Sequence, residues 1–347
     1  MIDLTNPEEI KKLDPKNVFG STELLGNQVS QVWQDKENLK IPDNYKDFDN
    51  VVVCAMGGSA LGGRVVSSLF ADELTKPVIV VNGYKLPAFV TKNSLIILTS
   101  YSGTTEETLS CAHHAIEKRT KIIGTATGGI LEEILVGNKL PFLKINPKFN
   151  PCGQPRIATG YGIFGIMGIL EKAKLLNIKD EDVSIAVESL NTNREKIKSE
   201  AINIAKDLYD TIPVIFSDEM FEGNAHILRN QFNESSKSFC TFSPIPELNH
   251  HLMEGLKYPD NKRLTILFLT SSLFSPSVKK RFDLTRDVVS KNNIKIITYE
   301  AHGDNKLTQM LDLLAFGGYV SLYLGLLYGV DPSLTPWVSY FKEQLTK

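Results

Sequence analysis

Short apolar runs alternate with longer amphipathic stretches along most of the chain. The apolar runs predict buried strands at residues 51–56, 77–82, 94–100, 121–126, 142–145, 211–217, 263–271 and 294–300, with a further strand just before Pro246. Between them, helical periodicity predicts helices over about 59–71, 104–118, 158–176, 181–208, 219–234, 277–291 and 305–329, and a last helix ending near Thr346. Apolar strands that alternate with helices are typical of parallel sheets covered on both faces. The pattern therefore predicts an α/β protein.

The scheme of strands and helices occurs twice, which predicts two α/β halves with a boundary near residues 178–190. We divide the chain into an N-terminal extension (1–20), a first domain (21–180) and a second domain (181–347). A proline-punctuated segment at 146–155 predicts a loop near the end of the first domain.

Composition narrows the class of protein. With 38 Lys and Arg against 40 Asp and Glu, the net charge is 38 − 40 = −2, which argues against a nucleic-acid-binding protein but not against a small anionic ligand. The polar N-terminus does not resemble a secretory signal, and the most apolar stretch, 314–330, is interrupted by glycines and predicts a buried helix rather than a membrane span. We expect a cytoplasmic protein that binds neither nucleic acid nor membrane.

Cysteine and histidine spacing gives no sign of a metal site. The four cysteines are far apart and lack CxxC spacing, which disfavours both zinc and a disulfide framework: Cys54, Cys111, Cys152 and Cys240. The adjacent pair His250-His251 has no accompanying HxH or HExxH motif.

A first chemical signal is the glycine-rich turn at 56–63, which follows a predicted strand and enters a helix. Glycines such as Gly57 and Gly58 let backbone N–H groups approach a ligand, and the helix N-terminus behind them favours an anion. No GK[ST] follows, so this is not a P-loop, and a plain β-to-α turn with packing glycines is the alternative.

A second signal is the hydroxyl-rich turn at 100–105, again between a strand and a helix. Its four hydroxyls could wrap a phosphomonoester without Lys or Arg: Ser100, Ser102, Thr104 and Thr105. The alternative is a capping box formed by Thr104 and Glu107, although a cap needs only one hydroxyl. Two such turns on neighbouring strands meet at the carboxyl edge of a sheet, where open α/β sheets bind ligands. Together they predict a site for a phosphorylated small molecule.

Three further residues are candidates for chemistry. Arg156 ends the proline-rich loop and either contacts the ligand or is an ordinary surface cation. Glu234 and His250 carry the side chains best suited to moving protons near neutral pH, although each alone also fits a solvated helix end or a loop.

Six motifs in this order resemble the bifunctional phosphoglucose/phosphomannose isomerases, enzymes with two sugar-isomerase (SIS) domains: GGSALGG (57–63), SYSGTTEET (100–108), PRIATGY (155–161), NESSK (233–237), PELNHHLMEG (246–255) and DPSLTPWVSYFKEQL (331–345). The resemblance runs from about residue 20 to the C-terminus. It implies an α/β fold of two SIS domains, each a parallel sheet flanked by helices. It also implies interconversion of glucose 6-phosphate and mannose 6-phosphate with fructose 6-phosphate through a cis-enediolate, without metal or cofactor.

The resemblance also assigns roles to residues. The substrate's phosphate would be held by Gly58, Ser59, Ser100, Ser102 and Thr105, and Gly57 would help to shape the turn. Arg156 would stabilise the enediolate, and Glu234 would move the proton between C2 and C1. His250, supplied by the neighbouring subunit of a homodimer, and Lys342 would open the sugar ring. Thr335 matches a threonine linked to acceptance of both C2 epimers.

The sequence departs from the family at one place and leaves other functions open. After His250 the family usually has Asn-Glu, whereas this chain has His251-Leu252. A non-catalytic sugar-phosphate sensor is the main alternative, since SIS domains also occur in regulators. An amidotransferase-type aminosugar isomerase would need about 200 further residues and an N-terminal Cys nucleophile.

Overall fold

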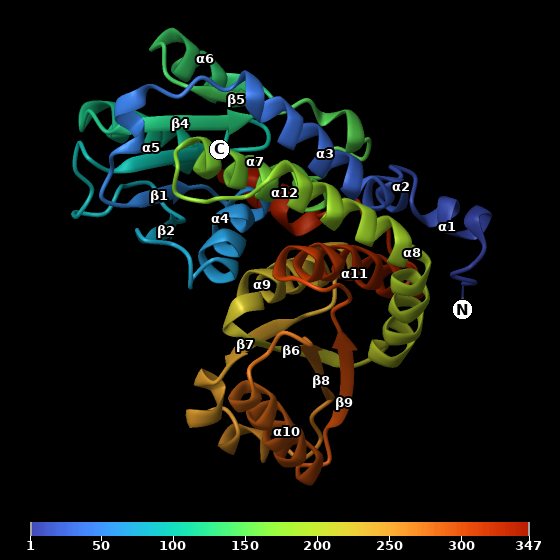
Figure 1. Cartoon of the computed structure of the whole chain (residues 1–347). Helices are drawn as coiled ribbons and strands as arrows, with labels where there is room; N and C mark the ends of the chain where they lie inside the picture. Colours follow the sequence, from blue (N-terminus) through green and yellow to red (C-terminus); the bar gives the residue numbers. More distant parts are fainter. Residues whose placement is uncertain (1, 346–347) are drawn as a thin grey trace.

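The chain forms two separate parallel sheets in a computed structural model that describes residues 2–345 (Figure 1). The first sheet has the order β2-β1-β3-β4-β5, with β1 (Val51–Cys54), β2 (Val78–Val81), β3 (Leu95–Thr99), β4 (Lys121–Ala126) and β5 (Phe142–Lys144). The second has the order β7-β6-β8-β9, with β6 (Ile212–Asp218), β7 (Thr241–Ile245), β8 (Leu264–Thr270) and β9 (Lys295–Glu300). Every strand expected from the apolar runs is present, and the α/β prediction is confirmed.

The helices cover both sheets and join them. They are α1 (Pro7–Leu13), α2 (Val18–Glu23), α3 (Leu25–Asp35), α4 (Gly57–Leu69), α5 (Glu106–Glu117), α6 (Gly129–Gly137), α7 (Thr159–Lys172), α8 (Asp180–Leu208), α9 (Glu222–Gln231), α10 (Pro276–Lys291), α11 (Lys306–Leu327) and α12 (Pro336–Leu345). The sequence pattern predicted most of these but missed α1, α2, α3 and α6. The expected end of the last helix at Thr346 lies outside the described residues.

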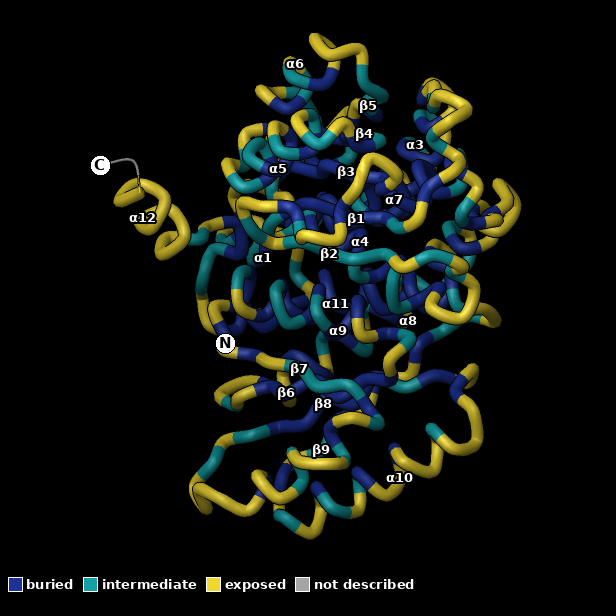
Figure 2. Tube along the Cα trace, turned by 90° about the vertical axis from the view of Figure 1, so that its left-hand side faces the viewer, coloured by how far each residue is buried: buried dark blue, intermediate teal, exposed yellow. Residues whose placement is uncertain are grey.

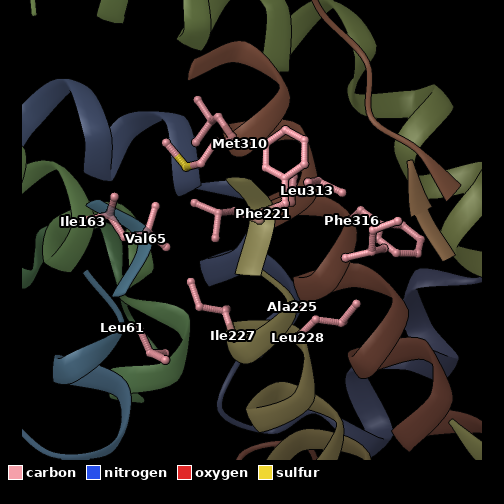
Figure 3. Close-up of a cluster of buried hydrophobic side chains, with 14 of the residues drawn as sticks. Leu61, Val65, Ile163, Phe221, Ala225, Ile227, Leu228, Met310, Leu313 and Phe316 are labelled. Carbon is pink, nitrogen blue, oxygen red and sulfur yellow. The ribbon is translucent and has the colours of Figure 1, made fainter. Parts of the chain in front are cut away.

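One apolar core runs through both halves of the molecule. Figure 3 shows its centre, where side chains of α4 and α7 meet those of α9, of the 3₁₀ turn Glu219–Phe221 before it and of α11: Leu61, Val65, Ile163, Phe221, Ala225, Ile227, Leu228, Met310, Leu313 and Phe316. Since α8 packs against both α3 and α11, it contacts helices of both halves. The expected boundary near 178–190 therefore falls where α8 begins, and the domain division stays a prediction.

Helix α11 explains the apolar stretch near the C-terminus. It is the one helix of the described chain that is long and apolar enough to cross a membrane, yet its most apolar stretch of 18 residues is entirely buried inside the protein. Its glycines let neighbours approach closely: a Cβ on Gly325 would lie 2.7 Å from the carbonyl oxygen of Ser235. The prediction of a buried helix is confirmed.

Helix α12 has no buried residue, because every one of its residues is exposed to solvent (Figure 2). Its apolar side chains include Trp337, which is 82% exposed, and Phe341, which is 61% exposed. Monomeric soluble proteins rarely leave such a continuous apolar surface uncovered.

Candidate functional site

The two predicted turns lie side by side. Strands β1 and β3 are parallel neighbours, with Val53 opposite Ile97, so their carboxyl ends open at the same edge of the sheet. Gly57 begins α4 with a φ of +49°, a conformation that glycine adopts at little cost. The N-termini of α4 and α5 both follow these strand ends, and they supply backbone N–H groups with partial positive charge.

Hydrogen bonds join the two turns into one cradle. The backbone N–H of Tyr101 donates to Ser59 Oγ at 2.9 Å, and the hydroxyls of Ser100 and Thr105 are bonded to each other at 2.8 Å. The hydroxyls of Ser102 and Thr104 form a second pair at 2.9 Å. Helix α5 begins without a side-chain cap, so the alternative of a capping box at this turn is wrong.

The cradle adjoins the loop that carries Arg156. A Cβ on Gly58 would lie 3.1 Å from the carbonyl carbon of Pro155 and 3.2 Å from the backbone nitrogen of Arg156. Only a residue without a side chain leaves this approach undisturbed. The glycine-rich turn and the proline-rich loop therefore form one continuous surface.

Arg156 is buried, with only 3% of its side chain exposed, and is not a surface cation. Its guanidinium donates to Ser235 Oγ at 3.2 Å, to Gln154 Oε1 at 3.0 Å and to the backbone carbonyls of Pro332 and Ser333. Burial lowers the pKa of Arg156 from its usual value, but a guanidinium stays charged in proteins. Arg156 thus connects the first half, the segment around Glu234 and the start of the C-terminal arm, which we define as residues 331–345.

Glu234 faces this cation. It lies in a single π-helical turn, Phe232–Ser236, that continues α9, and its Oε2 is 3.4 Å from Arg156 Nη1. Its side chain is 33% exposed, which leaves it accessible to a ligand. Burial raises the pKa of Glu234, while the positive charges of Arg156, Lys237 and Lys342 oppose that rise. A carboxylate with a raised pKa is a stronger base near neutral pH than an ordinary one.

The C-terminal arm brings its predicted residues toward the same place. Lys342 on α12 is close enough for its charge to act on the pKa of Glu234. Thr335 is partly buried and directly precedes α12, two residues after Ser333, whose carbonyl accepts from Arg156. Within the described residues, however, no hydrogen bond is recorded between either side chain and Glu234.

Among the described residues, no hydrogen bond joins His250 to Glu234, and His250 is not among the charged groups that act on the pKa of Glu234. His250 ends the short helical turn Glu247–His250, which follows β7, and it is exposed. Its neighbour His251, part of the departure from the family pattern, pairs with Glu247 at 2.7 Å through Nε2. That pair gives His251 a partner within the helical turn that it directly follows.

Three residues at the site were not assigned a role from the sequence. Gln154 and Ser235 both accept hydrogen bonds from Arg156, and Lys237 bonds to the C-terminal arm. Each is one to three residues from a residue that was singled out, and both Ser235 and Lys237 belong to the NESSK motif. Proximity to Glu234 and Arg156 in sequence was the available signal.

Taken together, the site holds a hydroxyl- and amide-lined cradle, a buried guanidinium and a partly exposed carboxylate. In residues 2–345 no group of three or more His, Cys, Asp and Glu side chains is arranged to hold a metal ion. Such a set of groups can bind a phosphorylated molecule at one end and move a proton at the other.

This fold and these groups define a tandem α/β protein of the SIS class. The family model for the bacterial phospho-glucose isomerase C-terminal SIS domain matches residues 197–345. Among solved structures, the C-terminal domain of glucosamine-fructose-6-phosphate aminotransferase from Francisella tularensis is similar in fold, with a TM-score of 0.70 over 91% of this chain and 97% of that one, at 13% identity.

Sequence relatives narrow the class to one family. A bifunctional phosphoglucose/phosphomannose isomerase from Caldicellulosiruptor bescii is 32% identical over 95% of this chain and 99% of the relative. Another, from Aquifex aeolicus, is 30% identical over 96% of this chain and 99% of the relative. The chain belongs to the bifunctional phosphoglucose/phosphomannose isomerase family.

Proposed function

We propose that the protein interconverts glucose 6-phosphate and mannose 6-phosphate with fructose 6-phosphate through a cis-enediolate. The observation that carries this proposal is the Arg156–Glu234 pair, 3.4 Å apart, adjoining the hydroxyl-lined cradle through Gly58. A cradle and a base on one surface allow the two ends of a single open-chain hexose phosphate to be held together. Membership of the family supports the same reaction.

In this mechanism the cradle holds the phosphate. Ser59, Ser100, Ser102 and Thr105 offer hydroxyls, and the two helix N-termini offer backbone N–H groups and partial positive charge. Binding at the phosphate end positions C1 and C2 at the far end of the chain, which lowers the entropic part of the barrier.

Glu234 then removes the proton from C2 of the aldose and returns it to C1. One base suffices because the proton leaves one carbon and rejoins its neighbour. The enediolate carries negative charge, and the guanidinium of Arg156 stabilises it with little reorganisation, since five N–H donors already fix its position. Thr335, at the start of the C-terminal arm, contributes to acceptance of both C2 epimers.

We further propose that the active protein is a homodimer in which His250 crosses to the partner's site and opens the sugar ring together with Lys342. Two features support the dimer: His250 is exposed and, among the described residues, is not hydrogen-bonded to its own Glu234, and α12 exposes its apolar side chains. We place this activity in the cytoplasm, where the four cysteines, all free and buried, remain reduced.

The reaction is tested by incubating the purified protein with glucose 6-phosphate or mannose 6-phosphate in D₂O. We expect fructose 6-phosphate carrying deuterium at C1, because the base exchanges its proton with solvent before returning it. The rate should not change with a chelator, since Arg156 supplies the positive charge. Binding of both sugars without product would favour the alternative of a non-catalytic sensor, and loss of activity on chelation would contradict the mechanism.

Subunit mixing tests the contribution of His250 across the interface. Glu234→Gln and His250→Ala should each be inactive alone, and equal mixing should make half of the dimers mixed. If His250 acts in trans, each mixed dimer has one intact site, and about a quarter of wild-type activity returns. If it acts in cis, every site in the mixture carries a substitution, and no activity returns.

A further inference from the structure

Two cations hold three consecutive backbone carbonyls at the start of the C-terminal arm. Lys237 Nζ donates to the carbonyl of Asp331 at 2.7 Å. Arg156 Nη2 donates to the next two carbonyls, those of Pro332 and Ser333. Lys237 follows Glu234 by three residues in the sequence, and Arg156 forms an ion pair with Glu234.

The local backbone aims Lys237 at this segment. It ends the π-helical turn that contains Glu234 and has a φ of +55°, the left-handed conformation that turns the chain after a helix. Its ammonium also donates to the carbonyl of Ser235 at 3.3 Å. Lys237 thus links the turn of the base directly to Asp331.

These contacts hold the start of the arm. All residues of α12 are exposed, so no face of this helix is buried in its own subunit. By contrast, Pro332 and Ser333 are buried beside Arg156. Thr335 and Lys342 lie beyond that anchored segment, so their placement relative to Glu234 follows from how residues 331–333 are held.

We infer that Lys237 is a positioning residue that, together with Arg156, fixes the C-terminal arm so that Thr335 and Lys342 face the reacting end of the sugar. This inference rests on the proposed function, because it assigns those two residues their roles there. Lys237 itself touches no reacting atom in this scheme.

Electrostatics gives Lys237 a second, measurable effect. The charged groups that act on it are Arg156, Asp331 and Glu234, and partial desolvation together with the Arg156 guanidinium lowers the pKa of Lys237 to about 8. In return, its positive charge lowers the pKa of Glu234, as do those of Arg156 and Lys342. Removing the charge at 237 should therefore raise the pKa of Glu234.

The test compares Lys237→Met, Lys237→Arg and a matched control. The control is Lys262→Met, because Lys262 also donates to two backbone carbonyls, those of Lys257 and Pro259, on an exposed part of the second half. Three quantities are measured: kcat and KM for both aldose phosphates over pH, the affinity for 5-phosphoarabinonate as an open-chain probe, and amide hydrogen exchange over residues 331–335.

We expect Lys237→Met to lower kcat by about ten- to a hundredfold, the range for a small misplacement of catalytic groups. Affinity for the open-chain probe should stay within about twofold of wild type, because the phosphate cradle is intact. Exchange at 331–335 should become faster, and the acid limb of kcat/KM should move to higher pH. Lys237→Arg should restore kcat and the acid limb, and Lys262→Met should resemble wild type.

If Lys237→Met had the kcat of the wild type and the same amide hydrogen exchange at 331–335, the inference would be overturned. A lower kcat with unchanged amide exchange would also overturn it, because Lys237 would then act only through its charge on Glu234. If Lys237→Met does not fold, Lys237→Gln, which also removes the charge, is measured in its place. These outcomes can be distinguished from a failure of the proposed function. If the wild-type protein isomerises neither sugar, the proposed function is wrong. If the wild type is active and Lys237→Met is unaffected, only the inference about Lys237 is wrong.

Discussion

Replacing Arg156 with Met should raise the pKa of Glu234 and shift the pH dependence of the reaction. The two side chains are 3.4 Å apart, so their attraction amounts to about 5 kcal/mol at an effective dielectric constant of about 20 and about 1 kcal/mol in bulk water. Because Glu234 is one third exposed, water screens part of this energy. Because the guanidinium of Arg156 lowers the pKa of Glu234, we expect that pKa to rise in Arg156→Met.

The assay is the pH profile of kcat/KM with glucose 6-phosphate. Glu234 must be ionised to act as the base, so the acid limb of the profile should move to higher pH in Arg156→Met as the pKa of Glu234 rises. The maximal rate should also fall by about 10²- to 10³-fold, because the enediolate loses its cation.

Arg229→Met provides the matched control for this experiment. Arg229 lines the same surface depression as Glu234, but its guanidinium is bonded to Asn230 and His226. Charge is lost from a neighbouring arginine in both variants, yet only Arg156 pairs with the carboxylate. An acid limb that stays in place in Arg156→Met, or that moves equally in Arg229→Met, would refute the assigned pairing.

Two further predictions concern the cradle and the stability of the second half. Gly58→Ala should raise KM for the sugar phosphates and lower the melting temperature, because the new Cβ meets Pro155 at 3.1 Å, whereas Gly83→Ala, which meets nothing within 4 Å, should leave KM unchanged. A hydrogen bond to Asp312 raises the pKa of His302 above 6.5, so the stability it contributes is complete below pH 6.5 and lost as pH rises through the raised value. Urea unfolding from pH 5 to 9 should show this decline in wild type, and a His302→Gln variant that kept the same decline would contradict the assignment.

Much of the fold was predictable because buried parallel strands are short continuous apolar runs. Runs such as 51–56 and 94–100 became β1 and β3, trimmed by one or two residues at their ends. Among the missed N-terminal helices, α3 does carry apolar residues at helical spacing, namely Leu25, Val29, Val32 and Trp33, so its pattern was present in the sequence and was overlooked. The helix expected over 219–234 is in fact α9 flanked by a short 3₁₀ turn and a π-helical turn, a distinction that depends on tertiary packing.

The site was predictable in part for a similar reason. The hydroxyl-rich turn follows a strand, so the sheet topology alone brings it beside the glycine-rich turn. The burial of Arg156 was not predictable, because its partners Pro332 and Ser333 are 176 and 177 residues away in sequence. The assigned roles of the individual side chains remain predictions.

The central claim is that Glu234 moves the proton between C2 and C1. The most direct measurement is the turnover of glucose 6-phosphate by Glu234→Gln, which preserves the size of the side chain and removes the base. We expect turnover to fall by about two to four orders of magnitude, the usual effect of removing a proton-transfer group, while the affinity for the sugar phosphate is retained. Near-normal turnover in a correctly folded variant would contradict the account.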